Sequence, residues 1–467
     1  MIKRLRPMLI LAGSALVLGI LLWVLVAFVL PKDDAGEEKG NEVLLIDADL
    51  TEADRVEVTN TFDEYTLVKK AIESYYIEGK EDYPVLYDNV SYLLEKLTDF
   101  TATKKLVEAP TAEQMEGYGL DDPEGTVVIV NNDDTYTLTF GTTSASGNYY
   151  CQLEGDPSVY LVATAVPDIV LLSRYQFYYG QMIEYSDEDT TENEDLTDMF
   201  ISGSGREQAL SITQQQLAED EVGTSYILTE PFRHSLSNTM LTDLSDMMVA
   251  MNVASIVGDD TSPEALAEKG LDDPTYIYRY IKGGETFEVH LGDVNASGYQ
   301  YCYETGGKFI YSILASDAEI LGDPLLNYCE DMIYTRSVDQ LAAIKVEGSN
   351  KTYNITIGEQ DEMGNYNVVI NNKKVDSELF SDFYSHILTI SITDLGQKGE
   401  ELQETLAVTF TLKDGTVEEM KFYPVSGLKC FCEVNGSGQF WVSKMNVEKI
   451  LENAQKLYNG EVITLEW

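Results

Sequence analysis

The sequence predicts an α+β fold, with an N-terminal transmembrane helix followed by tandem repeated units of antiparallel sheet with packed helices. The first observation behind this class is an uncharged, apolar run at residues 8–30. The second is a Gly-Leu-Asp-Asp-Pro sequence at 119–123 that returns at 270–274. The third is the alternation between segments with apolar residues at every second position, as in strands, and segments with spacings of three and four, as in amphipathic helices.

The apolar run at 8–30 has the length and the flanks of a membrane anchor. A helix of about 20 apolar residues crosses the hydrocarbon core of a bilayer and satisfies its own backbone groups. A basic end at 1–7 precedes the run, and a polar stalk at 31–44 follows it. Because basic flanks stay in the cytoplasm, we expect a single-pass protein of the cell membrane whose body is extracytoplasmic. A cleaved signal peptide is the alternative, but it would have a shorter apolar core and a small-residue cleavage site.

The body is strongly acidic but has the composition of a folded protein. The chain contains 31 lysines and arginines against 80 aspartates and glutamates, which gives a formal net charge of −49. Such a surface repels nucleic acid, because binding to nucleic acid depends on basic side chains that neutralise phosphates. With 44% hydrophobic residues, the chain can still build packed cores. We interpret the charge as a source of solubility and predict no nucleic-acid partner.

An internal repeat organises this body. Downstream of the two Gly-Leu-Asp-Asp-Pro sequences, Leu138–Gly141 is matched by Val289–Gly292. Further on, Asn148–Cys151 is matched by Tyr299–Cys302. A third copy aligns Cys432 with these two cysteines but lacks the Gly-Leu-Asp-Asp-Pro element. The predicted domains are α+β repeat unit 1 at 45–185, an acidic linker at 186–194, α+β repeat unit 2 at 195–335 and a divergent α+β repeat unit 3 at 336–467.

Each unit is expected to open with alternating strands, which an amphipathic helix follows. The apolar residues of these helices recur at spacings of three and four and so form one narrow stripe. In chain order they are Val90, Leu93, Leu94, Leu97 and Phe100, then Leu241, Leu244, Met248 and Met251, then Leu379, Phe383 and Ile387.

A short helix and a turn are expected next, at the repeated motif. The helix begins at Thr111 in the first unit and at Ser262-Pro263 in the second, where proline suits the first helical turn. It ends at the motif glycine, which can adopt a positive φ, and the motif proline prevents its continuation. A meander with turns at 131–134 and 282–284 and a last helix complete the unit. We predict a structural role for the motif residues Gly119, Leu120, Asp121, Asp122, Pro123, Gly270, Leu271, Asp272, Asp273 and Pro274, with both leucines packed inward.

Several of these features together resemble a known bacterial family. They are the N-terminal apolar run, the helix from Asn89 to Phe100, the Tyr118–Pro123 element, the turn that starts at Phe140-Gly141 and the strand Val159–Val162. The chain is similar to the membrane-anchored family called domain of unknown function 4340 over roughly residues 45–335, and weakly so in the third unit. Members often occur beside gliding-type ABC transporter components, so the resemblance implies an envelope or transporter-accessory role. It implies no catalytic residues.

Residues that carry chemistry are few and isolated. The three histidines, His234, His290 and His386, are far apart in the sequence, and a lone histidine is more often structural than catalytic. Gly203 and Gly205 lack the Lys-Ser/Thr pair of a phosphate-binding loop, so we predict a hairpin turn there.

The repeated aspartates, cysteines and tyrosines each have a functional and a structural interpretation. The aspartate pairs of the motif could serve a carboxylate-dependent hydrolase, but their place between glycine and proline favours a turn. The aligned cysteines could be redox-active, yet we predict that they are small buried apolar residues. The neighbouring tyrosines could stack on sugars or simply pack on the sheet. The residues concerned are Cys151, Cys302 and Cys432, with Tyr149, Tyr150, Tyr299 and Tyr301.

From these observations we predict no catalytic, cofactor-binding or metal-binding residue and no cofactor. The expected function is a non-enzymatic extracytoplasmic module that scaffolds or assists a membrane complex, with an ABC-type transporter as the expected complex. The expected partners are the membrane, through residues 8–30, and a transporter or another envelope protein. Two alternatives stay open: a module that binds an envelope polymer or sugar, and a carboxylate-dependent hydrolase.

Overall fold

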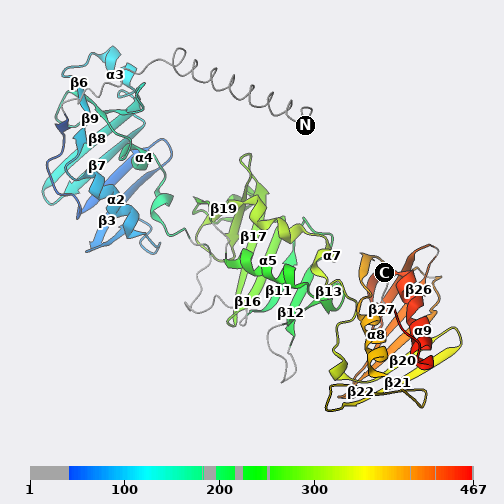
Figure 1. The fold of residues 1–467 in the computed structure, drawn as a ribbon. Helices are drawn as coiled ribbons and strands as arrows, with labels where there is room; N and C mark the ends of the chain where they lie inside the picture. The colour runs from blue at the N-terminus through cyan, green and yellow to red at the C-terminus, as the bar shows by residue number, and fades with distance from the viewer. Residues whose placement is uncertain are drawn as a thin grey trace, which may run out of the picture. The chain divides into compact units, whose positions relative to one another are not determined.

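The computed structural model describes residues 42–180, 182, 196–215, 225–249, 253–399, 401–425 and 427–464. The chain divides into two compact units, Met1–Tyr179 and Gly180–Trp467. The first compact unit contains one large antiparallel sheet, which falls in repeat unit 1. The second compact unit contains two more, one each in repeat units 2 and 3 (Figure 1). The acidic linker predicted at 186–194 lies outside the described residues.

The first large sheet has eight strands in the order β4-β3-β2-β7-β8-β9-β10-β6. Its strands are β2 (Arg55–Asn60), β3 (Glu64–Ala71), β4 (Ser74–Ile77), β6 (Lys104–Val107), β7 (Gly125–Asn131), β8 (Asp134–Thr143), β9 (Tyr149–Leu153) and β10 (Val159–Val162). The helical segments are α2 (Tyr87–Leu97), α3 (Ala112–Tyr118), α4 (Pro167–Val170) and the 3-10 turn η3 (Arg174–Phe177). A separate two-stranded sheet pairs β1 (Val43–Leu44), at the end of the predicted stalk, with β5 (Thr101–Ala102).

The second large sheet has nine strands in the order β14-β13-β12-β11-β16-β17-β18-β19-β15. Its strands are β11 (Leu196–Ser202), β12 (Leu210–Gln215), β13 (Ser225–Glu230), β14 (His234–Ser235), β15 (Ser255–Gly258), β16 (Tyr276–Lys282), β17 (Glu285–Val294), β18 (Tyr299–Glu304) and β19 (Ile310–Leu314). The helical segments are α5 (Asn238–Val249), α6 (Pro263–Ala267), η5 (Ala315–Gly322) and α7 (Leu325–Tyr328).

The third large sheet has nine strands in the order β23-β22-β21-β20-β25-β26-β27-β28-β24. Its strands are β20 (Leu341–Gly348), β21 (Lys351–Gln360), β22 (Tyr366–Ile370), β23 (Lys373–Val375), β24 (Ile392–Leu395), β25 (Leu406–Leu412), β26 (Val417–Pro424), β27 (Lys429–Val434) and β28 (Ser437–Ser443). The helical segments are η6 (Val338–Gln340), α8 (Ser377–Leu388) and α9 (Lys444–Asn459).

The three large sheets repeat one topology. In each, the first strand of the unit (β2, β11 or β20) lies between the hairpin that follows it and the meander that comes after the first helix. A strand that comes after this helix and before the meander (β6, β15 or β24) closes the far edge. The sheets fall one in each predicted repeat range, while the exact domain boundaries stay a prediction.

The predicted fold class is wrong and needs two corrections. The structure is mostly antiparallel sheet, arranged in four sheets, rather than a balance of helix and strand. The last helix expected in each unit is reduced to short turns in the first two, α4 with η3 and η5 with α7, and only α9 is long. In addition, none of the helices in the described ranges is long and apolar enough to cross a membrane. The transmembrane segment expected at 8–30, with the basic end at 1–7, lies outside these ranges.

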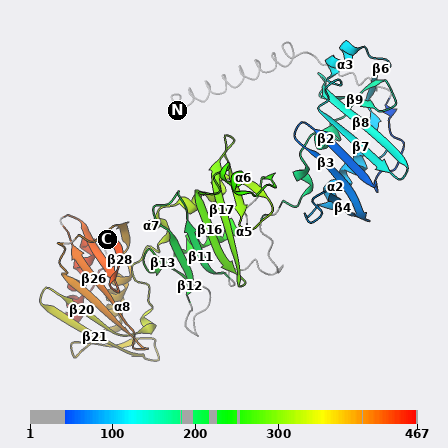
Figure 2. The same ribbon diagram turned by 180° about the vertical axis from the view of Figure 1, so that it is seen from behind.

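Helices cover one face of the first and third sheets and bury most of the apolar stripes predicted there. Opposite views show α2 on one face of the first sheet, and α8 with α9 on one face of the third (Figures 1 and 2). The stripe of α2 is confirmed, because Val90, Leu93, Leu94 and Leu97 are all buried. In α8, Phe383 and Ile387 are buried as predicted, whereas Leu379 is half-buried and its neighbour Phe380 is buried.

Candidate functional site

The repeated motif of the first unit ends a short helix, as predicted. Thr111 caps α3 through a capping box with Gln114, which satisfies two exposed backbone N–H groups. The helix is capped at its other end by Gly119, which has a φ of 66° in the left-handed region. Leu120 follows with its side chain buried. The aspartates Asp121 and Asp122 are exposed.

A second glycine explains how this helix end sits on the sheet. Gly141 lies on β8, directly under the end of α3, and a Cβ atom added to it would lie 2.1 Å from the carbonyl oxygen of Tyr118. A Cβ atom on Gly119 would lie 2.8 Å from Cγ2 of Thr142. The two backbones therefore approach so closely that only glycine fits at Gly141.

The second unit repeats this junction with different neighbours. Ser262 caps α6, Pro263 occupies its first turn, and Gly270 has a φ of 68°. A Cβ atom added to Gly292 on β17 would lie 2.2 Å from the carbonyl oxygen of Lys269. Leu271 is buried, and Asp272 and Asp273 are exposed. The positive φ of both motif glycines and the burial of both leucines are thus confirmed. The predicted helix end at the motif glycine is correct for α3 but wrong for α6, which ends at Ala267 with Glu268 as its C-cap.

The aligned cysteines are buried thiols in the sheet cores. Cys151, Cys302 and Cys432 each have no exposed surface, and all are free thiols. Burial raises the pKa of each of these thiols, to about 12 in Cys302. Because the thiolate is the reactive form, these cysteines are poor nucleophiles at neutral pH, in line with the predicted apolar packing role.

The three histidines do not meet one another or a shared cavity. His234 is buried, and its Nε2 lies 2.7 Å from the carbonyl oxygen of Glu330. His386 is also buried, with its Nε2 2.9 Å from the carbonyl oxygen of Asn446. Burial lowers the pKa of both imidazoles. His290, on β17, faces away from Val289 and lies 3.0 Å from Oε1 of Glu288.

Gly203 and Gly205 form the predicted hairpin turn. They lie between the antiparallel strands β11 and β12, and the backbone N–H of Gly205 donates to the carbonyl oxygen of Thr275. A Cβ atom on Gly203 would lie 2.4 Å from that same oxygen. The two glycines therefore permit a close approach between the turn and the chain before β16.

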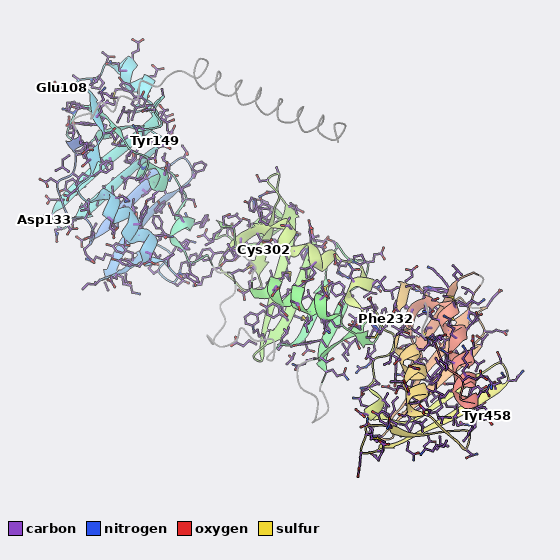
Figure 3. The ribbon with its side chains drawn as sticks, viewed as in Figure 1. Glu108, Asp133, Tyr149, Phe232, Cys302 and Tyr458 are labelled. Atoms are coloured by element: carbon purple, nitrogen blue, oxygen red, sulfur yellow. The ribbon has the colours of Figure 1, made fainter. Side chains whose placement is uncertain are left out.

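The tyrosines beside the buried cysteines lie on the opposite face of the sheet, because side chains alternate along a strand. Figure 3 labels Tyr149, which directly precedes Tyr150 in the first sheet, and Cys302 of the second sheet. In the first unit the ring of Tyr150 is 4.5 Å from the ring of Tyr118. In the second, Lys269 replaces Tyr118, and its Nζ lies 5.1 Å from the ring of Tyr301. Tyr150 and Tyr301, here called the outer tyrosines, are both half-buried.

A shallow pocket of about 460 Å³ surrounds the outer tyrosine of the second unit. Tyr299, Tyr301 and Lys269 form its aromatic and basic side. Ser255 and Ser312 contribute hydroxyl groups whose oxygens are 2.8 Å apart. An aromatic surface beside hydroxyls and one cation can bind a flat, polyhydroxylated ligand or a partner side chain. None of the four motif aspartates lines this pocket.

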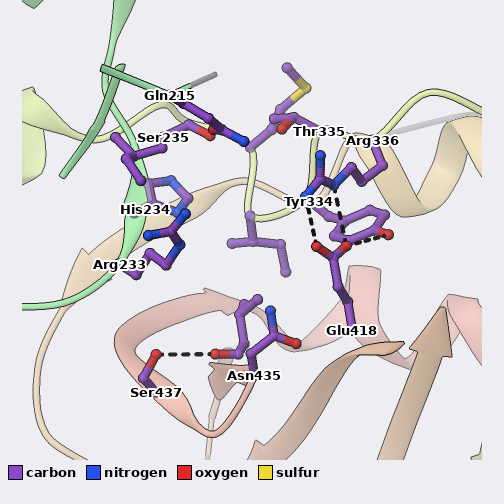
Figure 4. A pocket seen from close by; sticks show the side chains of 14 residues that line it. Gln215, Arg233, His234, Ser235, Tyr334, Thr335, Arg336, Glu418, Asn435 and Ser437 are labelled. Atoms are coloured by element: carbon purple, nitrogen blue, oxygen red, sulfur yellow. Dashed lines mark hydrogen bonds and ion pairs between the residues drawn. The ribbon is translucent and has the colours of Figure 1, made fainter. Parts of the chain in front are cut away.

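A second pocket, of about 150 Å³, lies in the second compact unit, where β13–β14, the segment 332–336 and the β27–β28 turn meet (Figure 4). Beside this pocket, Phe232 packs edge-on against Phe440, with ring centroids 5.0 Å apart, and the ring of the lining residue His234 lies 4.9 Å from the same phenylalanine. The lining is polar: Gln215, Arg233, Ser235, Arg336, Glu418, Asn435 and Ser437 all contribute. We call it the polar pocket.

One face of the polar pocket is an ion pair. Arg336 binds Glu418 through two contacts, of which the shorter joins Nη2 and Oε1 at 2.9 Å. The hydroxyl of Tyr334 donates to Oε2 of the same carboxylate at 3.0 Å. Burial, with the charge of Glu418, raises the pKa of Tyr334 and keeps its hydroxyl protonated. The carboxylate is therefore neutralised by its own neighbours.

Comparison with known proteins finds one family model that matches part of the chain. Residues 76–263 match the family model described as Domain of unknown function (DUF4340). This segment of the chain is similar to the DUF4340 family. The matched segment begins in β4 and ends at the first residue of α6, so it contains the motif of the first unit and stops before that of the second. No curated protein and no solved structure matches the chain.

The DUF4340 resemblance expected from the sequence is thereby confirmed within the matched range, while its link to ABC transporter components stays a prediction. The polar pocket was missed, because its lining residues are distant in sequence and share no motif. The one signal in the sequence that could have indicated this pocket was Arg233, a basic residue in a strongly acidic chain. The hydrolase alternative stays a prediction, and among the residues that the structure describes no group of three or more His, Cys, Asp or Glu could hold a metal ion.

Proposed function

We propose that this protein is a non-enzymatic binding module that scaffolds or assists a membrane-protein complex, with an ABC-type transporter as the expected complex. The observation that carries the proposal is the repeated placement of the outer tyrosines. The first two repeat units share one topology, and in each a half-buried tyrosine directly precedes the buried cysteine. The tyrosine side chain lies on the opposite face of the sheet from that cysteine. The residue before the motif glycine contacts this tyrosine in both units.

This arrangement suits protein recognition more than it suits chemistry. Tyrosine is enriched at protein interfaces because its ring offers a rigid apolar area and a hydroxyl. Tandem units that present equivalent positions give a partner several points of attachment, which raises the overall affinity when they bind together. The net charge of −49 favours a partner with a basic surface, because complementary charges speed association and exclude other proteins.

The test is affinity purification of the full chain from detergent-solubilised native membranes. We expect a membrane protein to be recovered in a fixed ratio. The double variant Tyr150→Ala and Tyr301→Ala should recover at least about tenfold less of it, because aromatic interface residues often contribute about 2 kcal/mol or more. Tyr92→Ala is the control, since Tyr92 is an exposed tyrosine on α2. Reproducible recovery of the chain alone contradicts the proposal.

A second candidate function is the binding of an envelope polymer or sugar. The pocket around Tyr301 favours it, because carbohydrate rings stack on aromatic faces while serine hydroxyls and a lysine can bind sugar hydroxyls. Cell-wall material or soluble glycans should then retain the chain in sedimentation assays. Tyr301→Ala should abolish retention, whereas Tyr150→Ala should leave it unchanged. An absence of retention at every calcium concentration rules this candidate out.

A further inference from the structure

The polar pocket holds a basic side chain that the rest of its lining does not neutralise. Arg233 is exposed at the pocket edge, and within the described part of the chain it has no ion pair or hydrogen bond through its side chain. Arg336 is already paired with Glu418. With one paired and one unpaired arginine and a single carboxylate, the lining carries one net positive charge, in a chain with a net charge of −49.

A neutral donor is fixed on the opposite side of the same pocket. Asn435 has a φ of 53° in the β27–β28 turn, and its Oδ1 accepts a hydrogen bond from the backbone N–H of Glu419 at 2.7 Å. This bond determines the orientation of the amide, because only the oxygen can accept. The Nδ2 group is therefore left as a donor, and Figure 4 shows Asn435 at the floor of the pocket, with Arg233 and Arg336 above it.

The remaining lining restricts what can occupy the pocket. The ring of His234 packs on Phe440 and uses its Nε2 for the carbonyl oxygen of Glu330, so it forms a wall. Ser235 adds a hydroxyl at the same edge as Arg233. A volume of about 150 Å³ is well below the roughly 300 Å³ at which pockets begin to hold drug-sized ligands. It corresponds to a few water molecules or one small ion.

From these contacts we infer that the polar pocket binds a small oxyanion, either phosphate or the carboxylate of a small acid. Arg233 would bind two of its oxygens, since a guanidinium matches oxyanions with paired donors. Nδ2 of Asn435 would donate to another oxygen. The lining residues come from the second and the third sheet, so an occupant stabilises the contact between those two sheets. The inference does not depend on the proposed function.

Isothermal titration of the purified full-length chain tests this inference. Inorganic phosphate and sodium acetate are titrated separately, with sodium chloride holding the ionic strength constant. We expect saturable binding of one anion per chain for at least one of the two, and the anion that binds identifies the ligand class. A lack of saturable binding by both anions overturns the inference.

Variants locate the binding in the pocket. Arg233→Gln should weaken binding about tenfold or more, because charge-assisted hydrogen bonds typically contribute more than the 1.4 kcal/mol that corresponds to a factor of ten. Asn435→Asp keeps the acceptor for Glu419 but replaces the free donor with a negative charge, so it should abolish binding while the turn still folds. Arg279→Gln, an exposed arginine on β16 outside the pocket, is the matched control and should change affinity by less than about twofold. Equal affinities for Arg233→Gln, Arg279→Gln and the wild-type chain overturn the site.

A thermal readout separates loss of folding from loss of binding. Ligands that bind only the native state raise the unfolding temperature as their concentration rises. The binding anion should raise the unfolding temperature of the wild-type chain and of Arg279→Gln. Asn435→Asp should keep a cooperative transition that the anion does not move. An equal rise in Asn435→Asp contradicts the inference.

Discussion

The first and third large sheets differ in what covers one equivalent position on the sheet surface: a helix end in the first and aromatic side chains in the third. In the register of the two sheets, Phe140 pairs with Cys151 and Phe422 pairs with Cys432, so Gly141 of the first sheet corresponds to Tyr423 of the third. Over Gly141 lies the end of α3, in near contact with its backbone. In the third unit, the described residues between β24 and β25 (396–399 and 401–405) contain no helix.

Aromatic side chains occupy this space in the third sheet. Tyr423 is buried, with its hydroxyl 2.7 Å from Oε2 of Glu433 and the Nζ of Lys398 3.6 Å from its ring centroid. Phe431, which corresponds to the outer tyrosines, is buried against Trp441, with ring centroids 5.3 Å apart. One fold therefore tolerates either a helix end on two glycines or a cluster of aromatic rings. At the position shared by Tyr150 and Phe431, only the first solution leaves the aromatic ring half-exposed for a partner.

The largest expected effect comes from removing the aromatic ring at this shared position. Phe431→Ala should destabilise the third sheet by about 4 kcal/mol, because a fully buried phenylalanine leaves a cavity. Tyr150→Ala, at the corresponding position of the first sheet, should cost about 1 kcal/mol, because its ring is half-buried. Urea unfolding followed by tryptophan fluorescence and circular dichroism measures both. Similar costs for the two variants would remove the distinction between the sheets.

The next effect tests the close approach at the first junction. Gly141→Ala should destabilise the first unit by about 3 kcal/mol, because the added methyl group would overlap the backbone oxygen of Tyr118. Gly155→Ala is the control, since Gly155 has a φ of 85° and open space around it. Its cost should be about 1 kcal/mol, from backbone conformation alone. Thermal unfolding ranks the two, and the reverse order would be inconsistent with the junction described.

A smaller effect concerns the hydroxyl that anchors the aromatic cluster. Tyr423→Phe should cost about 1 kcal/mol, because the half-buried carboxylate of Glu433 loses one hydrogen bond. Tyr301→Phe in the second unit should change stability by less than about 0.5 kcal/mol, since no hydrogen bond of its hydroxyl is found in the described ranges. Urea unfolding detects the difference. An unchanged midpoint for Tyr423→Phe would show that the ring alone fills this space.

The smallest expected effect is a difference in acid sensitivity between two hairpins. In the first sheet, hydrogen bonds from Tyr160 and Ser158 lower the pKa of Asp156 from 3.8 to about 2. A carboxylate with a lowered folded-state pKa stabilises the protein above its unfolded pKa, and this stability is lost as the pH falls from about 4 to 2. Asp156→Asn should therefore lose less stability than the wild-type chain over that interval.

The corresponding hairpin of the third sheet turns through Asn435-Gly436 and has no carboxylate at the turn itself. Asn-Gly is well suited to a two-residue hairpin, because both residues accept a positive φ. Unfolding curves of Asp156→Asn and the wild-type chain, recorded from pH 5 to pH 2, check the effect. Parallel curves for the two proteins would mean that the Tyr160 contact does not persist in solution.

Local patterns in the sequence predicted much of this structure, because they act within a few residues. The stripe of α2, the caps at Thr111 and Ser262, and the positive φ of Gly119 and Gly270 all depend on neighbours in the chain. The meander turns at 131–134 and 282–284 were also predicted correctly, with positive φ at Asn132, Gly283 and Gly284.

What the sequence could not predict depends on contacts between distant residues. Gly141 was recognised as part of a repeat, but its reason is the carbonyl oxygen of Tyr118, which only the folded backbone brings near. The polar pocket joins Arg233 to Asn435 across two sheets. The excess of strand was missed because short edge strands such as β14 and β23 have two or three residues, too few for any periodicity. The last helix was overestimated, because this part of the chain is divided into short segments, α4 and η3 in the first repeat unit and η5 and α7 in the second.

The central claim, that the outer tyrosines of the first two units contact a partner protein, can be tested by site-specific photo-crosslinking in native cells. A photoreactive phenylalanine analogue replaces Tyr150, Tyr301 or, as a control, Tyr92 on α2. We predict that positions 150 and 301 crosslink to the same membrane protein and that position 92 does not. Crosslinks of equal yield from position 92, or none from positions 150 and 301, would contradict the account.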